Sequence, residues 1–199
     1  MGRNTRTVIQ GCVTRMNKKE RLSFVEYHLK ELLVPECRVL DLGCGTAQYR
    51  DSFKWIYVGL DITSLPYSDG FPRDVNVVAS GSKLPFAEGS FNLIFSVAAF
   101  YQMPDSEMVL KECHRILKPG GQLLLFDYNR RTQRLLEKKE GHRLPCWNYW
   151  QLKRLFQKAY FKNIQWRSAV AASRTLFQQA ISYWMSEWRG QWLIIKGNK

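Results

Sequence analysis

The sequence predicts an α/β protein with a doubly wound, mostly parallel sheet. Five short apolar runs, each bounded by Gly, Asp or Pro, follow one another between residues 38 and 126, and segments suited to helices lie between them. Runs of this kind are typical of strands that are buried on both faces of a sheet. Their alternation with helices favours right-handed crossovers, which place helices on both faces.

The first part of the chain supplies five of the expected strands. They cover residues 38–42, 56–60, 75–79, 91–96 and 122–126. The clearest helix between them is 106–117, which the Lys-Pro-Gly-Gly residues 118–121 end. Ahead of the first strand, apolar residues at helical spacing predict an amphipathic helix over 18–33, which Pro35 stops.

The pattern changes after residue 127. A basic connection over 128–143 leads into an aromatic, basic helix at 147–162, a strand near 164–166, a second helix over 169–188 and a closing strand at 191–196. No internal repeat or Gly/Pro/Ser-rich linker divides the chain, and 199 residues fit one domain. We expect residues 1–16 to form a flexible basic arm and residues 17–199 to form a single domain.

Composition excludes several classes of protein. Apolar residues make up 45% and charged residues 24% of the chain, which is typical of globular proteins and argues against disorder. No apolar run approaches the roughly 18 residues of a membrane span, so we expect no stable membrane insertion and a cytoplasmic protein. Five widely spaced cysteines without a C-x-x-C pair argue against a disulfide framework or zinc site, so no metal is expected.

The net charge of +13 is unevenly distributed. Residues 1–30 carry +5, residues 31–110 carry −5 and residues 111–199 carry +13. This asymmetry favours an anionic partner for the ends of the chain, and a basic solvated surface that only aids solubility is an equally good interpretation.

The strongest motif is the segment 39–47, Val-Leu-Asp-Leu-Gly-Cys-Gly-Thr-Ala, in which an apolar strand leads into a glycine turn and then a helix. Gly43 and Gly45 permit positive φ and close approach of a ligand, and Asp41 can accept hydrogen bonds from cationic or N–H groups. Twenty residues after Asp41, Asp61 ends the second strand, where a carboxylate can take both hydroxyls of a ribose. The third glycine of a dinucleotide turn is absent.

These residues resemble the class I S-adenosylmethionine-dependent methyltransferases, and in particular the small-molecule type that includes ubiquinone and menaquinone biosynthesis enzymes. Residues 41–46 resemble the family's first motif, 84–86 and 89–94 its loop and fourth strand, and 111–123 the helix and glycine turn before its fifth strand. The resemblance covers about residues 36–127. It implies a seven-stranded Rossmann-like methyltransferase sheet with an antiparallel last strand, and S-adenosylmethionine as cofactor.

The resemblance also implies a set of cofactor-binding residues. They are Asp41, Gly43, Cys44, Gly45, Thr46, Asp61, Ile62, Ser80, Gly81, Ser82, Ser96 and Val97. Ser80 and Gly81 stand where the family often has Asp-Ala, so Ser80 or backbone groups have to replace the usual carboxylate acceptor for the adenine amine. Tyr101 and Gln102 replace the paired histidines of many relatives, so the family's catalytic residues do not carry over.

The catalytic residues therefore stay unassigned. Methyl transfer from a sulfonium needs mainly positioning, and a base only where the acceptor enters protonated. His142, Tyr101 and Tyr128 are candidates, since they follow the fourth and fifth strands, beyond whose carboxyl ends ligands bind in open α/β sheets. For His114, in the helix 106–117, packing is the better interpretation.

Three functions remain open. The first is methylation of a small, acidic acceptor that the basic segments after strand five attract. The second is methylation of RNA, since Lys and Arg alternate with Trp and Tyr in the basic C-terminal third. The third is a binding module that keeps the fold without turnover. The sequence leaves the oligomeric state and the role of the 169–188 helix open.

Overall fold

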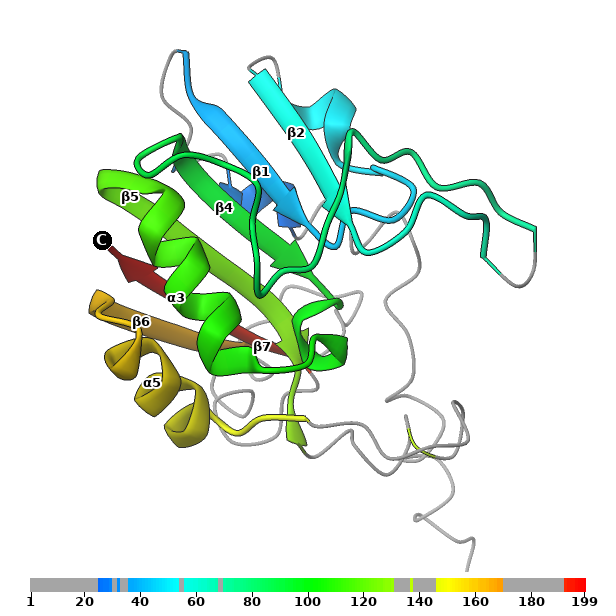
Figure 1. Cartoon of the computed structure of the whole chain (residues 1–199). Coiled ribbons are helices and arrows are strands. Elements are labelled where there is room, and N and C mark those ends of the chain that lie inside the picture. Colours follow the sequence, from blue (N-terminus) through cyan, green and yellow to red (C-terminus); the bar gives the residue numbers. More distant parts are fainter. Residues whose placement is uncertain are drawn as a thin grey trace, which may run out of the picture.

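The computed structural model describes residues 25–29, 32, 36–53, 56–67, 70–130, 137, 146–169 and 192–199. They form one seven-stranded sheet in the order β3-β2-β1-β4-β5-β7-β6 (Figure 1). The strands are β1 (Arg38–Leu42), β2 (Ile56–Asp61), β3 (Val77–Val78), β4 (Phe91–Val97), β5 (Leu117–Tyr128), β6 (Lys162–Ala169) and β7 (Trp192–Asn198). Neighbours from β3 to β5 pair in parallel, and β7 runs antiparallel to both β5 and β6. The predicted fold class is confirmed.

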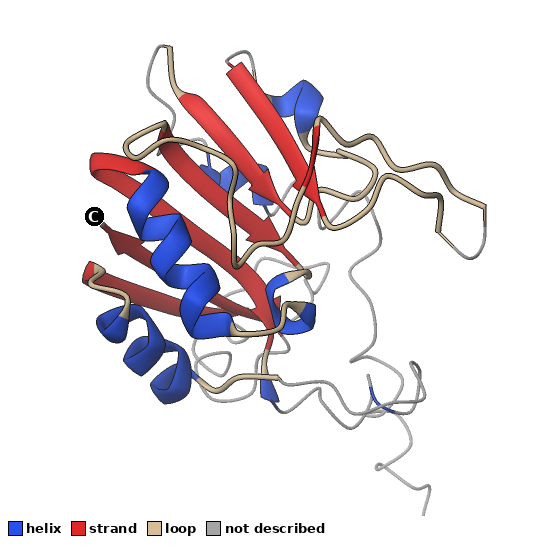
Figure 2. Cartoon of the chain, viewed as in Figure 1, coloured by secondary structure: helices blue, strands red, loops and turns tan. Residues whose placement is uncertain are grey.

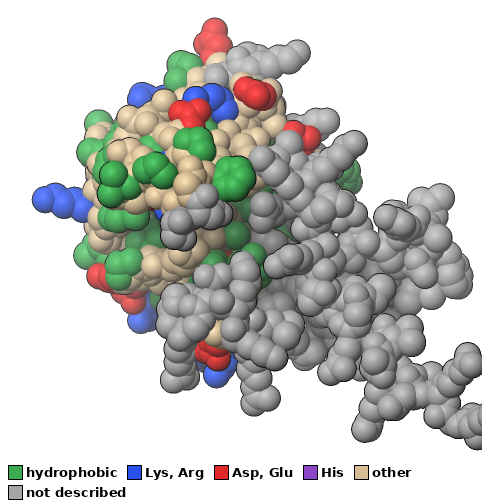
Figure 3. All heavy atoms as spheres, turned by 90° about the vertical axis from the view of Figure 1, so that its right-hand side faces the viewer, with side chains coloured by type: hydrophobic (Ala, Val, Ile, Leu, Met, Phe, Trp, Pro, Cys, Tyr) green, Lys and Arg blue, Asp and Glu red, His purple; other side chains and the backbone are tan. Residues whose placement is uncertain are grey.

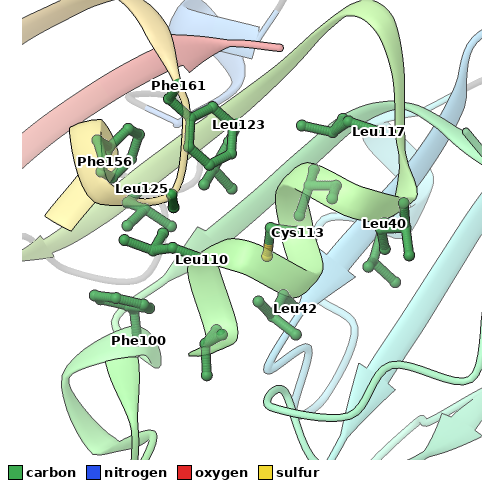
Figure 4. Close-up of a cluster of buried hydrophobic side chains, with 14 of the residues drawn as sticks. Leu40, Leu42, Phe100, Leu110, Cys113, Leu117, Leu123, Leu125, Phe156 and Phe161 are labelled. Atoms are coloured by element: carbon green, nitrogen blue, oxygen red, sulfur yellow. The ribbon is translucent and has the colours of Figure 1, made fainter. Parts of the chain in front are cut away.

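The strands are buried on both faces because their side chains alternate between two apolar layers. On one face, Leu40 and Leu42 of β1 contact a layer that includes helices α3 (Ser106–Ile116) and α5 (Tyr149–Lys158) (Figures 2 and 4). On the opposite face, Val39 packs in a second layer together with Val25 and Leu29, which belong to the helical residues 25–29.

Helix α3 begins and ends where its sequence favours a boundary. The carboxylate of Asp105 accepts a hydrogen bond from the Met108 N–H (3.2 Å), which satisfies one of the free donors at the helix start. Val109, Leu110, Cys113 and Ile116 recur at helical spacing and are fully buried against the sheet. The predicted helix 106–117 is thus confirmed to within one residue.

Helix α5 has a reciprocal cap at its start. The Asn148 side chain accepts from the Gln151 N–H (2.9 Å), and the Gln151 side chain accepts from the Asn148 N–H (3.1 Å). Leu152 and Phe156 are buried, while Trp150 is 66% exposed. The helix is shorter than predicted because β6 already begins at Lys162.

Three crossovers differ from the expectation of regular helices. After the glycine turn the described residues form turns and the three-residue 3₁₀ helix η1 (Arg50–Ser52) rather than an α-helix. The described residues between β2 and β4 form loops, apart from the two-residue strand β3.

The Lys-Pro-Gly-Gly segment lies inside the span of β5 rather than ahead of it. The pairing of β4 with β5 shifts here from Phe91 opposite Leu117 to Leu93 opposite Gln122, so residues 118–121 loop out between two paired stretches. The arm 1–16, His142 and almost all of the predicted helix 169–188 lie outside the described residues. Within the described part, no helix has the length and apolar character needed to cross a membrane.

Candidate functional site

An open cleft of about 770 Å³ lies at the carboxyl ends of β1, β2 and β4. This is the edge of a doubly wound sheet where ligands bind, since β1 and β4 lie side by side but connect in opposite directions. Eleven of the twelve residues predicted to bind a cofactor line the cleft, and they are Asp41, Gly43, Cys44, Gly45, Thr46, Asp61, Ile62, Ser80, Gly81, Ser82 and Val97.

The glycine turn after β1 has the backbone shape that only glycine adopts readily. Gly43 and Gly45 have φ values of +79° and +54°. A Cβ on Gly43 would collide with the Cβ of Ala99, so this glycine lets the segment after β4 pack on the turn. The Gly43 N–H donates to the carbonyl oxygen of Leu60 (2.8 Å), which ties the turn to β2.

Asp41 is a buried carboxyl in the wall of the cleft, 1% exposed. Its Oδ2 accepts a hydrogen bond from the Tyr57 hydroxyl (2.7 Å). Burial raises the pKa of Asp41 to about 7, the Tyr57 hydrogen bond opposes that rise and the nearby charge of Asp61 adds to it. A cation that enters the cleft beside Asp41 would therefore stabilise its ionised form.

Asp61, the second carboxylate of the cleft, is held by three donors. Its Oδ2 accepts from the Gly45 N–H (2.9 Å) and from Nη1 of Arg73 (3.0 Å), and its Oδ1 accepts from the Ile62 N–H (2.7 Å). These contacts fix the orientation of the carboxylate toward the turn after β1.

Cys44 lies between the two glycines as an unreactive thiol. Burial raises its pKa to about 12, and the charges of Asp41 and Asp61 act in the same direction. The thiol lies 3.7 Å from the carbonyl oxygen of Asp74, to which it donates. Cys44 therefore contributes packing to the cleft rather than a nucleophile.

Of the three serines predicted to bind a cofactor, two line the cleft and one lies behind its wall. Ser80 and Ser82 line the cleft, with their hydroxyl oxygens 2.9 Å apart. Ser96 is 1% exposed and lies outside the lining, and its hydroxyl donates to the Leu42 carbonyl oxygen (2.7 Å). Ser96 thus supports the wall of the cleft from behind.

Of the candidate catalytic residues, Tyr101 and Tyr128 lie beside the cleft rather than in it, and His142 lies outside the described residues. Tyr101 is 6% exposed, its ring lies edge-on to that of Tyr128 (5.3 Å between centroids), and Cys146 packs with both. The neighbouring Asp127 is fully buried, and burial raises its pKa to about 7. His114 packs its ring on Phe161 (5.2 Å), which agrees with the structural interpretation of this residue.

Arg73 and Tyr67 are among the cleft residues that were not found from the sequence. The Arg73 guanidinium binds Asp61 and lies over the Tyr67 ring, 3.9 Å from its centroid. Both residues belong to the segment 62–74, which carries no motif and no periodic pattern that could have marked them. No group of three or more His, Cys, Asp or Glu residues among the described ones is arranged to hold a metal.

Comparison with known proteins finds methyltransferases as relatives. Residues 40–125 match the model of a family described as "Methyltransferase domain". Over 129 residues, the chain is 34% identical to malonyl-[acyl-carrier protein] O-methyltransferase 1 of Coxiella burnetii, which covers 62% of the chain and 43% of that relative. The chain is thus similar over residues 40–125 to methyltransferases. It is also 32% identical over 108 residues to demethylmenaquinone methyltransferase of Mycolicibacterium vanbaalenii, covering 52% of the chain and 47% of that relative.

Solved structures support the same fold. A S-adenosylmethionine-dependent methyltransferase of Thermotoga maritima, described as a possible histamine N-methyltransferase, superimposes with a TM-score of 0.63 at 22% identity, covering 90% of each chain. Phosphoethanolamine N-methyltransferase 2 of Haemonchus contortus, solved with S-adenosylmethionine, gives 0.63 at 16% identity over 88% of this chain and 52% of that one. The chain spans less than half the length of the two curated relatives named above.

Proposed function

We propose that this methyltransferase transfers the methyl group of S-adenosylmethionine to a small, acidic acceptor. The observation that carries the proposal is the pair of buried carboxylates, Asp41 and Asp61, that flank the glycine turn inside one cleft. A cofactor with an ammonium group, a sulfonium and a ribose needs anionic and hydrogen-bond-accepting partners, and this pair supplies both.

The polar residues of the cleft fit the separate polar groups of the cofactor. Asp41, whose pKa burial raises to about 7, suits the ammonium group, because a cation beside it offsets the cost of ionising a buried carboxyl. Asp61 suits the ribose hydroxyls. Ser80 and Ser82, at the far side of the cleft, suit the adenine edge, since their hydroxyls both donate and accept. The bound cofactor supplies the electrophilic methyl group.

The remaining wall suits the acceptor. Val97, Ala98, Ala99 and Met103 form an apolar surface after β4 that keeps water away from the transfer, and Gln102 adds a polar group. A sulfonium loses its charge as the methyl group moves, so the chain has mainly to hold the acceptor in line. A carboxylate acceptor enters already ionised and needs no general base, which agrees with a described lining that holds no histidine.

Two further observations favour an acidic acceptor. The net charge of +13 attracts anions to the whole chain. The Coxiella burnetii relative acts, by its name, on malonyl-[acyl-carrier protein], whose malonyl group is a carboxylate. A quinol acceptor, which the name of the Mycolicibacterium vanbaalenii relative indicates, would instead need a base for its hydroxyl or ring carbon.

The test is a screen of candidate acceptors for production of S-adenosylhomocysteine. It should include free and carrier-bound dicarboxylates, demethylated quinols and bulk RNA, with Asp41→Asn and Asp61→Ala as inactive controls. Turnover of a carboxylate that both substitutions abolish is the expected result. Turnover restricted to quinols or to RNA would refute the proposal that the acceptor is an acidic small molecule.

RNA remains the second candidate because of one described feature of α5. Trp150 is 66% exposed, and Lys153 Nζ lies 5.7 Å from the ring centroids of both Trp150 and Tyr149. An exposed ring beside a cation is a stacking platform for a base. The coloured side chains on the face shown in Figure 3 are a mixture of apolar, acidic and basic types without one dominant charge. Trp150→Ala should abolish methylation of RNA if RNA is the substrate and leave a small acceptor unaffected.

A further inference from the structure

Arg73 lies in the cleft beside the carboxylate that the proposed function assigns to the ribose, and the inference below rests on that function. The segment that contains it, residues 62–74, extends from the carboxyl end of β2 (Figure 1). The Arg73 side chain is 17% exposed and lines the cleft, and its Nη1 lies 3.0 Å from Asp61 Oδ2. Its Nε is buried, so the other N–H groups of the guanidinium are the donors through which this side chain can contact a ligand in the cleft.

Asp61 alone cannot accept both ribose hydroxyls in this arrangement. An ionised carboxylate has about four acceptor positions, two on each oxygen. Oδ2 already receives the Gly45 N–H and Arg73 Nη1, and Oδ1 receives the Ile62 N–H. One position remains, on Oδ1, whereas two hydroxyls that both donate to the carboxylate would need two.

Tyr67 holds Arg73 in this position. The guanidinium lies over the Tyr67 ring at 3.9 Å from its centroid, which is a cation–π contact. The Tyr67 hydroxyl lies against Gly45, where a Cβ would collide with it, so the tyrosine is in turn held by the glycine turn. Because a guanidinium presents its N–H groups in a fixed, planar fork, holding Nη1 on Asp61 also fixes the direction of its other N–H groups.

We propose that Arg73 is a second ribose-binding residue. One hydroxyl of the cofactor ribose donates to Oδ1 of Asp61, and the adjacent hydroxyl accepts from an N–H group of the Arg73 guanidinium. The diol is thereby recognised through one acceptor and one donor rather than through a carboxylate alone. Tyr67 is the positioning residue that keeps the guanidinium in place.

If Arg73 blocked the ribose site instead of binding the ribose, its removal would change the affinity for the cofactor in the opposite direction. If Arg73 occupied the ribose position and had to leave before the cofactor could enter, its removal would free Asp61 and tighten binding. The contacts of the guanidinium argue against that role, because displacing it would break both the cation–π contact with Tyr67 and the bond to Asp61. The direction of the change in affinity therefore decides between the two roles.

The experiment is calorimetric binding of S-adenosylhomocysteine to the wild-type chain, Arg73→Ala, Arg73→Lys and the control Arg154→Ala. Arg154 is an exposed arginine on α5, so its removal changes the net charge equally without touching the cleft. We expect Arg73→Ala to weaken binding by about tenfold, the typical cost of losing a hydrogen bond to a charged group. Arg73→Lys should lose nearly as much because lysine has no planar fork, and Arg154→Ala should bind as the wild type does.

Two deoxy ligands locate the contact. For S-adenosylhomocysteine that lacks either the 2′- or the 3′-hydroxyl, the effect of Arg73→Ala should vanish for one ligand and persist for the other. Tyr67→Leu should weaken binding in the wild-type background and have no effect once Arg73 is alanine.

Unchanged or tighter binding by a folded Arg73→Ala variant would overturn the proposal, as would an equal loss for both deoxy ligands. Circular dichroism of each variant confirms folding. A wild-type chain that binds no S-adenosylhomocysteine would instead overturn the proposed function, so the two failures are distinguishable.

Discussion

The buried carboxyl of Asp41 makes the stability of the cofactor-free chain depend on pH, and Asp41→Asn tests this dependence. Burial raises the pKa of this carboxyl from 3.8 to about 7. The folded chain then holds the proton more tightly than the unfolded chain does. The free energy of unfolding consequently falls as pH rises from about 4 to about 7, and the whole loss is present above pH 7.

The magnitude follows from the two pKa values. A pKa of about 7 instead of 3.8 corresponds to about 4 kcal/mol of unfavourable free energy for the charged carboxyl in the fold. Asparagine removes that charge and keeps an oxygen for the Tyr57 hydroxyl, which now donates to Oδ2 at 2.7 Å. At pH 8 we expect a rise in melting temperature of about 8–16 °C, since about 1 kcal/mol shifts a chain of this size by about 2–4 °C. At pH 4 the rise should be small.

The assay is thermal unfolding of the cofactor-free wild type and Asp41→Asn between pH 4 and pH 8, combined with calorimetric binding of S-adenosylhomocysteine. The same substitution should weaken binding more than tenfold at pH 8, because it removes the charge that we assign to the ammonium group. In the wild type, binding should weaken as pH falls below 7, where Asp41 has to lose a proton first. Asp127→Asn is the matched control, since it removes another buried carboxyl of raised pKa that does not line the cleft.

A melting-temperature difference between Asp41→Asn and the wild type that does not change with pH would refute the reasoning. It would show that the carboxyl is not destabilised by burial. A gain at pH 8 with unchanged binding would keep the stability argument and remove Asp41 from the ammonium site.

Three further substitutions test the cleft and its support. Asp61→Ala should weaken S-adenosylhomocysteine binding by about ten- to a hundredfold, because it removes an ionised acceptor and releases the Gly45 N–H. If a folded Asp61→Ala variant bound the ligand in calorimetry as tightly as the wild type does, Asp61 would be excluded from the site. Gly45→Ala should lower the free energy of unfolding, measured in urea, by more than about 1 kcal/mol, because Gly45 has a φ of +54° and a Cβ there would clash with Tyr67. Gly70→Ala is the control, since Gly70 has a φ of +83° but open space around it. It should show only the loss of stability that comes from the strained backbone conformation. The Arg115 hydrogen bonds hold the pKa of Glu112 below its usual range, so Glu112→Gln should destabilise the chain at neutral pH. The difference in melting temperature between this variant and the wild type should disappear as pH falls through that lowered pKa. A difference in melting temperature that stays constant with pH would contradict this.

The sequence was a good guide wherever a local pattern determines the structure. Helix α3 could be predicted because its apolar residues recur at helical spacing and Lys-Pro-Gly-Gly follows. The glycine turn and both carboxylates could be placed because the carboxyl ends of parallel strands meet at one edge of a sheet.

The rest depends on contacts between residues that are distant in the chain. The pair of Asp61 and Arg73 depends on how the loop after β2 folds back, and no periodicity records such a path. For Tyr101 the sequence left a role beside the acceptor and simple packing equally open, and only the fold shows that it packs against Tyr128 and Cys146.

The loop crossovers between β2 and β4 have a consequence for how this methyltransferase opens. Elements with few buried apolar contacts unfold locally at a small fraction of the global free energy of unfolding. The wall of the cleft that carries Tyr67 and Arg73 shows no helix among its described residues, 62–67 and 70–74, and its large side chains Ile62, Leu65 and Phe71 are 64–71% exposed. Partial opening of this wall should therefore occur while the sheet stays folded, so that a protease cuts the chain between residues 62 and 74 before it cuts elsewhere in the sheet region. A bound cofactor, held by both sides of the cleft, would slow that cleavage in proportion to its occupancy.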